Sequence, residues 1–137
     1  MVQFRIWKGQ WTKKDCEAHP DDIFVYGDNE RRQGCNGQAQ IRPCDNAVGI
    51  RTRHRPTSFP AAYWSDAASH TNSVLINEDF NTLRLVIEQR EAQNKDCTVW
   101  FAEDGCGASA AKLQKKAPKT YAYLASRLNS MLGEKIF

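Results

Sequence analysis

Long apolar runs are missing from this chain of 137 residues. No segment approaches the roughly 18 apolar residues that a helix needs to cross a bilayer. The first residues, Met1 to Trp7, also lack the apolar stretch of a secretory signal. These absences argue against a membrane-spanning protein and predict a soluble, cytoplasmic one with no membrane among its partners.

Paired cysteines and metal-ligand spacings are missing as well. The chain has five cysteines and three histidines, and no two cysteines form a Cys-x-x-Cys pair. Structural zinc sites usually need such spacings, so we expect no metal and no other cofactor. Without an export signal, the thiols are expected to stay reduced. They belong to Cys16, Cys35, Cys44, Cys97 and Cys106.

A strong charge of one sign is the third absence. Lysine and arginine number 19 and aspartate and glutamate 16, which gives a net charge of +3. This balance suits an anionic ligand, whereas nucleic-acid-binding domains usually carry a stronger, clustered basic charge. One basic run, Arg51, Arg53, His54 and Arg55, is equally consistent with a solvated loop and with a binding surface.

What is present is an alternation of strand and helix patterns over a length that suits one domain, residues 1–137. The predicted strands span residues 2–7, 23–26, 46–50, 74–76 and 98–101. The predicted helices span residues 13–18, 38–41 and 77–94, a last helix begins at Pro118, and 51–60 is predicted as a loop. This order favours an α/β fold, a three-layer α/β/α sandwich with a mixed, largely parallel sheet.

Two of the predicted strands run directly into polar turns that contain glycine. The first turn begins at Gly27-Asp28-Asn29 and includes Gly34 and Gly37, and the second is Glu103-Asp104-Gly105-Cys106-Gly107. In a parallel sheet both turns lie at the same edge, where α/β proteins bind ligands. Glycine lets the backbone approach a ligand closely, and free N–H groups attract phosphate. The pattern alone is equally consistent with two ordinary connections between strands and helices.

Several motifs resemble those of a family of small bacterial and phage proteins. They are Phe24-Val25-Tyr26-Gly27-Asp28-Asn29, Arg32, Gly34, Gly37-Gln38-Ala39, Asn46-Ala47-Val48-Gly49-Ile50, Tyr63-Trp64-Ser65-Asp66, Asp104-Gly105-Cys106-Gly107 and Ala117-Pro118. That family in turn resembles macrodomains, which bind ADP-ribose. The resemblance implies a macrodomain-like fold and a pocket for a phosphorylated nucleotide. It also implies a bacterial host cell as the setting and is compatible with a phage gene.

The resemblance implies roles for individual residues. Asn29 would hold the ribose distal to the adenine, and Gly34 and Gly37 would flank that ribose and the diphosphate. Residues 105–109 would donate N–H groups to the diphosphate, and the aromatic pair at 63–64 would stack on a base. The implied ligand-binding residues are Gly27, Asn29, Arg32, Gly34, Gly37, Gln38, Arg51, Tyr63, Trp64, Asp104, Gly105, Cys106, Gly107, Ala108 and Ser109.

The sequence also departs from the macrodomain pattern. Cys35-Asn36 stands where the family has more glycine. The turn at residues 105–109 reads Gly-Cys-Gly-Ala-Ser, where the family has a longer Gly-x-Gly-Thr-Gly turn. Macrodomains carry an aspartate after the first strand that reads the adenine, and Lys8-Gly9-Gln10 offers none. We therefore expect the second turn to hold its phosphate less closely, and the adenine contact stays open.

Carboxylates are the candidate catalytic groups. Asp28 and Glu103 lie beside the two turns, where a carboxylate near a ribose C1″ would activate water. Aspartate at a turn more often bonds to its own backbone, which is the preferred interpretation of Asp104. No histidine is clearly paired with a cysteine, which argues against a thiolate nucleophile.

Three functions remain. The first is a pocket for an ADP-ribose-type nucleotide or an ADP-ribosylated macromolecule, with hydrolysis of an ADP-ribosyl bond left open. The second is sequestration of a signalling nucleotide in phage–host conflict, without catalysis. The third and least favoured is a nucleic-acid-binding module, because acidic residues are interleaved with its basic ones. That module would use Arg31, Arg32, Arg51, Arg53 and Arg55. The oligomeric state is left open.

Overall fold

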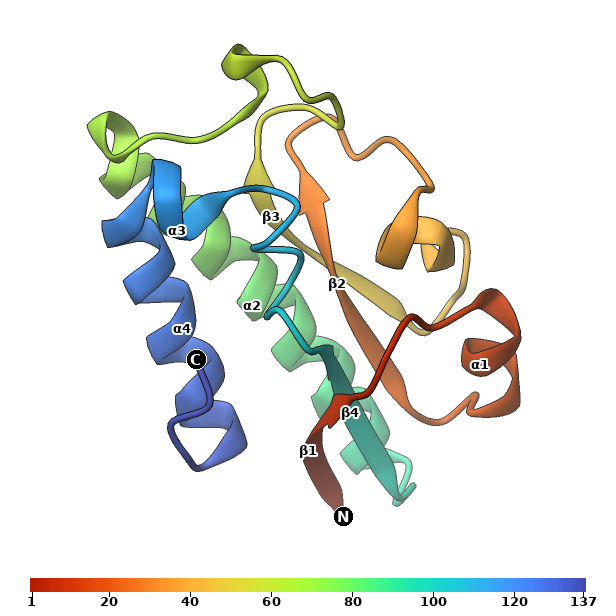
Figure 1. The fold of residues 1–137 in the computed structure, drawn as a ribbon. Coiled ribbons are helices and arrows are strands. Elements are labelled where there is room, and N and C mark those ends of the chain that lie inside the picture. Colours follow the sequence, from red (N-terminus) through yellow and green to blue (C-terminus); the bar gives the residue numbers. More distant parts are fainter.

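The computed structural model describes residues 1–137 and contains a four-stranded parallel sheet (Figure 1). The strands are β1 (Val2–Trp7), β2 (Ile23–Asn29), β3 (Ala47–Arg53) and β4 (Cys97–Ala102). Their order across the sheet is β1-β4-β2-β3, so β4, the last strand of the chain, lies between β1 and β2. Every strand pair is parallel, and antiparallel pairing is limited to an isolated bridge between Arg53 and Tyr63.

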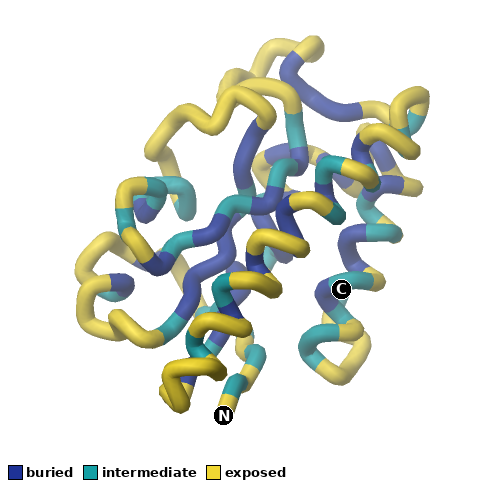
Figure 2. The backbone as a smooth tube through the Cα atoms, turned by 180° about the vertical axis from the view of Figure 1, so that it is seen from behind, coloured by how far each residue is buried: buried dark blue, intermediate teal, exposed yellow.

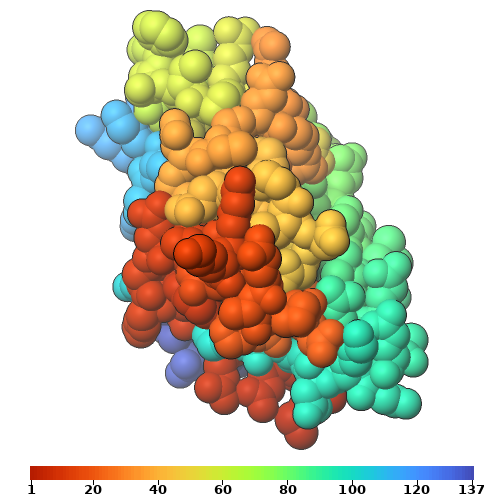
Figure 3. Space-filling model, turned by 90° about the vertical axis from the view of Figure 1, so that its right-hand side faces the viewer, coloured from red at the N-terminus to blue at the C-terminus, as the bar shows by residue number.

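Helices lie on both sides of this sheet (Figure 1). The α-helices are α1 (Lys13–Ala18), α2 (Ser69–Ala92), α3 (Leu113–Lys116) and α4 (Pro118–Leu132). The 3-10 helices are η1 (Gly37–Ile41), η2 (Pro60–Ala62) and η3 (Asp66–Ala68). The long helices α2 and α4 cover one face, and α1 and η1 lie against each other on the opposite face (Figure 3). No helix is long and apolar enough to span a bilayer.

The connections place a topological switch point between β2 and β4. The chain crosses the sheet in one direction from β1 to β2 to β3, and it returns from β3 to β4. Right-handed crossovers require the outward and return connections to lie on opposite faces, which is where η1 and α2 lie. The chain therefore leaves the adjacent strands β2 and β4 toward opposite faces. Ligands of open α/β sheets bind at such points.

Strand β2 is buried on both faces, which accounts for its continuous apolar run (Figure 2). Ile23 and Val25 belong to the larger core cluster, together with apolar residues of α2 and α4. Phe24 and Tyr26 belong to a smaller cluster with Trp11 and residues of α1 and η1. Alternate residues of one strand thus fill two cores.

Most of the predicted elements are confirmed. Residues 2–7 form β1, 13–18 form α1 and Pro118 begins α4. The strands predicted at 23–26, 46–50 and 98–101 correspond to β2, β3 and β4, and 38–41 falls within η1. The α/β class is correct, and the sheet is parallel throughout rather than mixed.

The prediction was wrong around residue 75 and at the end of β3. Residues 74–76 are not a strand but part of α2, which begins at Ser69 rather than Asn77. Ile76 is fully buried in the core on the same side of α2 as Phe80, so tertiary packing decides its structure. Residues 51–60 are not entirely loop, because β3 continues to Arg53.

Strand β2 and the loop after β4 touch backbone to backbone. A Cβ atom built on Gly27 would lie 2.7 Å from the Cα of Gly107 and would overlap the carbonyl group of Cys106. Only glycine at position 27 permits this approach. The contact brings the two polar turns of the sequence together.

We therefore expect Gly27→Ala to lower the free energy of unfolding by about 1–3 kcal/mol, because the added methyl group meets backbone rather than a movable side chain. Urea denaturation of the variant measures the loss, and hydrogen exchange should increase at residues 105–109.

The matched control is Gly133→Ala, where nothing lies within 4 Å of the added Cβ atom. It should lose only about 1 kcal/mol, from its left-handed backbone, and leave hydrogen exchange at residues 105–109 unchanged. Equal losses with no change in exchange at that loop would contradict the backbone contact.

Candidate functional site

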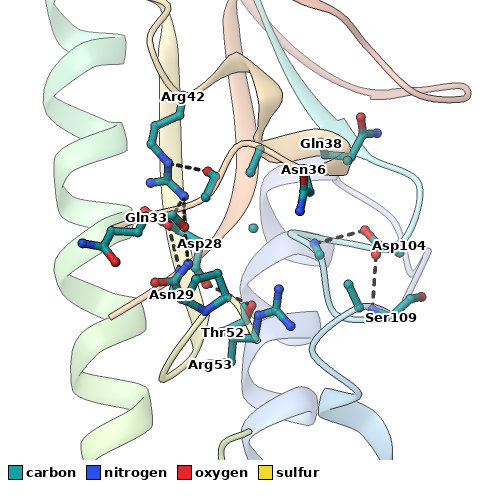
Figure 4. Close-up of a pocket in the computed structure, with 17 residues that line it drawn as sticks. Asp28, Asn29, Gln33, Asn36, Gln38, Arg42, Thr52, Arg53, Asp104 and Ser109 are labelled. Atoms are coloured by element: carbon teal, nitrogen blue, oxygen red, sulfur yellow. Dashed lines mark hydrogen bonds and ion pairs between the residues drawn. The ribbon is translucent and has the colours of Figure 1, made fainter. Parts of the chain in front are cut away.

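A cavity of about 340 Å³ opens at the carboxyl edge of the sheet, at the switch point between β2 and β4 (Figure 4). Its walls come from the ends of β2 and β3, the segment around η1 and the loop after β4. Only two of the 17 lining residues are hydrophobic, and none carries an aromatic ring. The residues are Gly27, Asp28, Asn29, Gln33, Gly34, Asn36, Gly37, Gln38, Ala39, Arg42, Thr52, Arg53, Pro56, Asp104, Gly107, Ser109 and Ala110.

Asp28 is a buried carboxylate at the end of β2. Its Oδ1 lies 2.7 Å from Nη2 of Arg42 and accepts a hydrogen bond from the backbone N–H of Asn29 at 2.8 Å. Its Oδ2 accepts one from Nη1 of Arg32 at 2.8 Å. Burial alone would raise the pKa of Asp28, but these three donors outweigh it and lower the pKa below its usual value. Asp28 therefore stays ionised and is a weak general base.

A second carboxylate extends these contacts to α2. Nη2 of Arg32 lies 2.6 Å from Oδ1 of Asp79, and Nε of Arg51 lies 3.0 Å from Oδ2 of the same residue. The backbone N–H of Arg51 also donates to Asp79 at 2.7 Å. Asp28, Arg32, Arg42, Arg51 and Asp79 form what we call the arginine–aspartate network. It joins β2, β3 and α2 at the carboxyl edge.

Residues 33–38, which we call the amide loop, expose their backbone donors. None of the N–H groups from Gln33 to Gln38 donates a hydrogen bond within the protein. Their carbonyl groups are partly occupied, because Arg42 donates to the oxygens of Gly34 at 2.9 Å and Gln33 at 3.1 Å. Gly34 (φ +94°) and Gly37 (φ +58°) have left-handed backbones, which favour glycine. The amide loop therefore has more free backbone N–H donors than free carbonyl acceptors.

Arg53 adds a positive charge to the cavity. Its Nη1 donates weakly to the carbonyl of Thr57 at 3.4 Å, and no carboxylate lies within ion-pair distance of it. Thr52 is buried beside it, and its hydroxyl group lies 3.5 Å from the carbonyl oxygens of Asp28 and Cys106. Of the guanidinium groups in the cavity wall, Arg42 is paired with Asp28 and Arg53 has no anionic partner.

Another wall is the Asp104 loop, residues 103–109, of which Asp104, Gly107 and Ser109 line the cavity. Oδ1 of Asp104 accepts a hydrogen bond from the backbone N–H of Gly107 at 3.1 Å, and Oδ2 accepts one from Ser109 at 3.2 Å. Gly105, Cys106 and Gly107 all have positive φ angles, between +57° and +70°. This backbone curls around the carboxylate. The interpretation of Asp104 as a residue bonded to its own turn therefore agrees with its contacts.

The cavity brings together nine of the residues predicted for the site. They are Gly27, Asp28, Asn29, Gly34, Gly37, Gln38, Asp104, Gly107 and Ser109. Two of these have structural contacts of their own. The side chain of Asn29 bonds to the carbonyl of Gln33 and the N–H of Arg31, and that of Gln38 bonds to Gly9 and Trp11.

Other predicted residues lie outside the cavity lining. Arg32 and Arg51 belong to the arginine–aspartate network, and Gly105, Cys106 and Ala108 form the far side of the Asp104 loop. The carboxylate of Glu103 accepts a hydrogen bond from the N–H of Gly9. Burial raises the pKa of the Cys106 thiol, so Cys106 is not an activated nucleophile.

The predicted base-stacking pair is buried elsewhere. The ammonium groups of Lys112 and Lys116 lie 5.3 Å and 5.1 Å from the centre of the Tyr63 ring. Trp64 is buried in the core and donates from Nε1 to Glu30 at 2.9 Å. Neither ring reaches the cavity, so the base has no aromatic contact there.

Several cavity residues were not predicted. They are Gln33, Asn36, Ala39, Arg42, Thr52, Arg53, Pro56 and Ala110. Arg53 belongs to the basic run at residues 51–55, which left its role open. The others carry no local signal, because their place depends on how the two turns meet. No three His, Cys, Asp or Glu side chains converge on a point that suits a metal ion.

Fold and cavity together define an α/β protein with a polar, ligand-sized pocket at the switch point of a parallel sheet. The chain belongs to DUF7831, a family of unknown function, which it matches over residues 6–127. That range contains both loops of the pocket. No curated protein and no solved structure matches the chain.

The low pKa of Asp28 makes its contribution to stability dependent on pH. A carboxylate with a lowered folded pKa stabilises the fold above its unfolded pKa, about 4, and loses that effect as the pH falls through the folded value. We expect Asp28→Asn to lose about 3 kcal/mol at pH 7, because Arg42 loses its carboxylate partner and Arg32 keeps only Asp79. The difference from the wild type should shrink steadily below about pH 4.

Urea denaturation of both proteins between pH 7 and pH 2 measures this difference. Asp45→Asn is the matched control, because Asp45 is exposed and makes no ion pair. It should match the wild type at neutral pH. A difference between Asp28→Asn and the wild type that stays constant with pH would contradict the pairing of Asp28.

Proposed function

We propose that this protein binds a phosphorylated ribose ligand, a nucleotide of the ADP-ribose type, in the cavity at the switch point. The observation that carries the proposal is the wall formed by the amide loop and Arg53. Every residue of the amide loop except Cys35 lines the cavity, and their backbone N–H groups have no protein acceptor; Arg53 beside them has no carboxylate partner. Consecutive free amides and an arginine are the groups with which proteins bind phosphate.

The size and polarity of the cavity support a sugar phosphate. A volume of about 340 Å³ is near the lower end of ligand pockets, which range from roughly 300 to 1,000 Å³. This volume suits a phosphorylated ribose better than a complete dinucleotide. The lining offers amide and hydroxyl groups from Asn29, Asn36 and Ser109 for ribose hydroxyls. The adenine would then lie outside the cavity, which fits the lack of an aromatic ring within it.

On this proposal the fold is a small macrodomain-like sandwich of three layers. Its support is the placement of α2 and α4 on one face of the sheet and of α1 and η1 on the other. A pocket between the turns after β2 and β4 also corresponds to the resemblance in sequence.

Binding without hydrolysis is the form of the function that the contacts support best. A general base needs a free carboxylate that faces the ligand. Asp28 is held by two arginines, Asp104 by two backbone N–H groups, and Glu103 lies outside the cavity lining. We therefore favour sequestration or recognition of the nucleotide over cleavage of an ADP-ribosyl bond.

Binding of nucleic acid has weaker support. That function needs a continuous basic surface. Of the five arginines that such a surface would use, Arg32 and Arg51 are engaged with Asp28, Glu78 and Asp79.

Isothermal titration calorimetry tests the proposal, with ADP-ribose, NAD, cyclic ADP-ribose, ribose 5-phosphate, AMP and a cyclic dinucleotide as ligands. We expect the phosphorylated ribose ligands to bind and to be recovered intact when the mixtures are separated by chromatography. Recovery of cleaved products would show that the protein is an enzyme. If none of the ligands bound, the proposal would fail.

Arg53→Gln should weaken binding of any ligand in this panel by about tenfold or more, since a charge-assisted hydrogen bond to phosphate is lost. The same titrations measure the change. Arg55→Gln is the matched control, because Arg55 is exposed, carries the same charge and does not line the cavity. Equal effects of the two substitutions would show that only the general charge of the surface matters, not the contact in the cavity.

A further inference from the structure

The two walls of the cavity have opposite character. The amide loop and Arg53 supply donors and positive charge that no protein group neutralises. In the wall formed by the Asp104 loop, the carboxylate of Asp104 brings negative charge, and no lysine or arginine lies within ion-pair distance of it (Figure 4). A ligand phosphate therefore meets attraction on one wall and a like charge on the other.

Asp104 also occupies the donors of its own wall. Its two oxygens accept hydrogen bonds from Gly107 at 3.1 Å and Ser109 at 3.2 Å, and all three residues line the cavity. Backbone N–H groups in such a curled segment form a nest that takes an anion. Here the anion is already present, because it is the carboxylate of the same loop.

We infer that Asp104 takes the place of a second ligand phosphate, so that the site selects ligands that present one phosphate to the cavity over those that present two. This inference rests on the proposed function and narrows its ligand class: an ADP-ribose-type ligand would present the phosphate of its distal ribose to the cavity and leave its second phosphate outside with the adenine. The single phosphate binds at the amide loop and Arg53. A second phosphate would have to displace the carboxylate from Gly107 and Ser109 or lie beside it, and like charges placed side by side in an interface are strongly unfavourable.

Two ligands that differ only by one phosphate test this directly. Calorimetry should show that the wild-type protein binds AMP about tenfold or more tightly than ADP. In Asp104→Asn the charge is removed while one oxygen still accepts a backbone N–H group. The preference should then fall by about tenfold, mainly because ADP binds more tightly.

Asp104→Ser is the second variant and keeps a short acceptor for the loop. Asp45→Asn removes the same charge from an exposed position outside the cavity and should keep the wild-type preference. Thermal denaturation establishes that each variant is folded. Titrations with inorganic phosphate and pyrophosphate repeat the comparison without the nucleoside and should give the same order.

The outcomes separate the two proposals. Wild-type protein that binds ADP as tightly as AMP overturns the inference, whatever the variants do. An unchanged preference in folded Asp104→Asn or Asp104→Ser also overturns it, while binding itself would still support the proposed function. If the wild type binds neither nucleotide nor ADP-ribose, the proposed function fails and the inference fails with it.

Discussion

The pairing of Asp28 with Arg32 and Arg42 is the interaction on which the carboxyl edge of the sheet depends. Arg42 uses its remaining donors to fix the carbonyl groups of the amide loop, and Arg32 extends the network to Asp79 on α2. Asp79 in turn binds Arg51 on β3. Because Arg32 joins the two buried carboxylates, the loss of either carboxylate disturbs ion pairs on more than one element. The shape of the pocket therefore depends on ion pairs that begin in its wall, at Asp28 and Arg42, and extend to residues behind it.

Local pattern was sufficient for most of the fold. The apolar patterns of β1, β2 and β4 predicted these strands because they follow which residues are buried. Pro118 likewise indicated the start of α4. The start of α2 gave no such signal, because Ala68 provides no side-chain cap. Asn77-Glu78-Asp79 was a false start signal. Asp79 is acidic in the middle of a helix because it binds arginines far away in the sequence, a cause that no local pattern contains.

Residues of the candidate site were predictable from the sequence where backbone conformation determines their place. They were unpredictable where the place of a side chain depends on its ion-pair or hydrogen-bond partners. Gly27, Gly34, Gly37 and Gly107 line the cavity because each permits a close approach or a left-handed turn, which the sequence marks locally. The arginines carry no such mark. Arg51 and Arg53 lie on the same strand, yet Asp79 engages only the first, and the second remains for the cavity. Tyr63 and Trp64 are likewise turned away by contacts with lysines and with Glu30.

The backbone contact between Gly27 and the Cys106–Gly107 segment limits how the pocket can change over evolution. Where main-chain atoms meet, no exchange of side chains can widen the cavity. Any side chain added at Gly27 would disrupt this backbone contact. On the proposed function, ligand preference would therefore change through side chains that line the cavity, such as Asn36, Arg53 and Ser109. On the same proposal, a chain that keeps this backbone contact could accept a different ligand while keeping the fold.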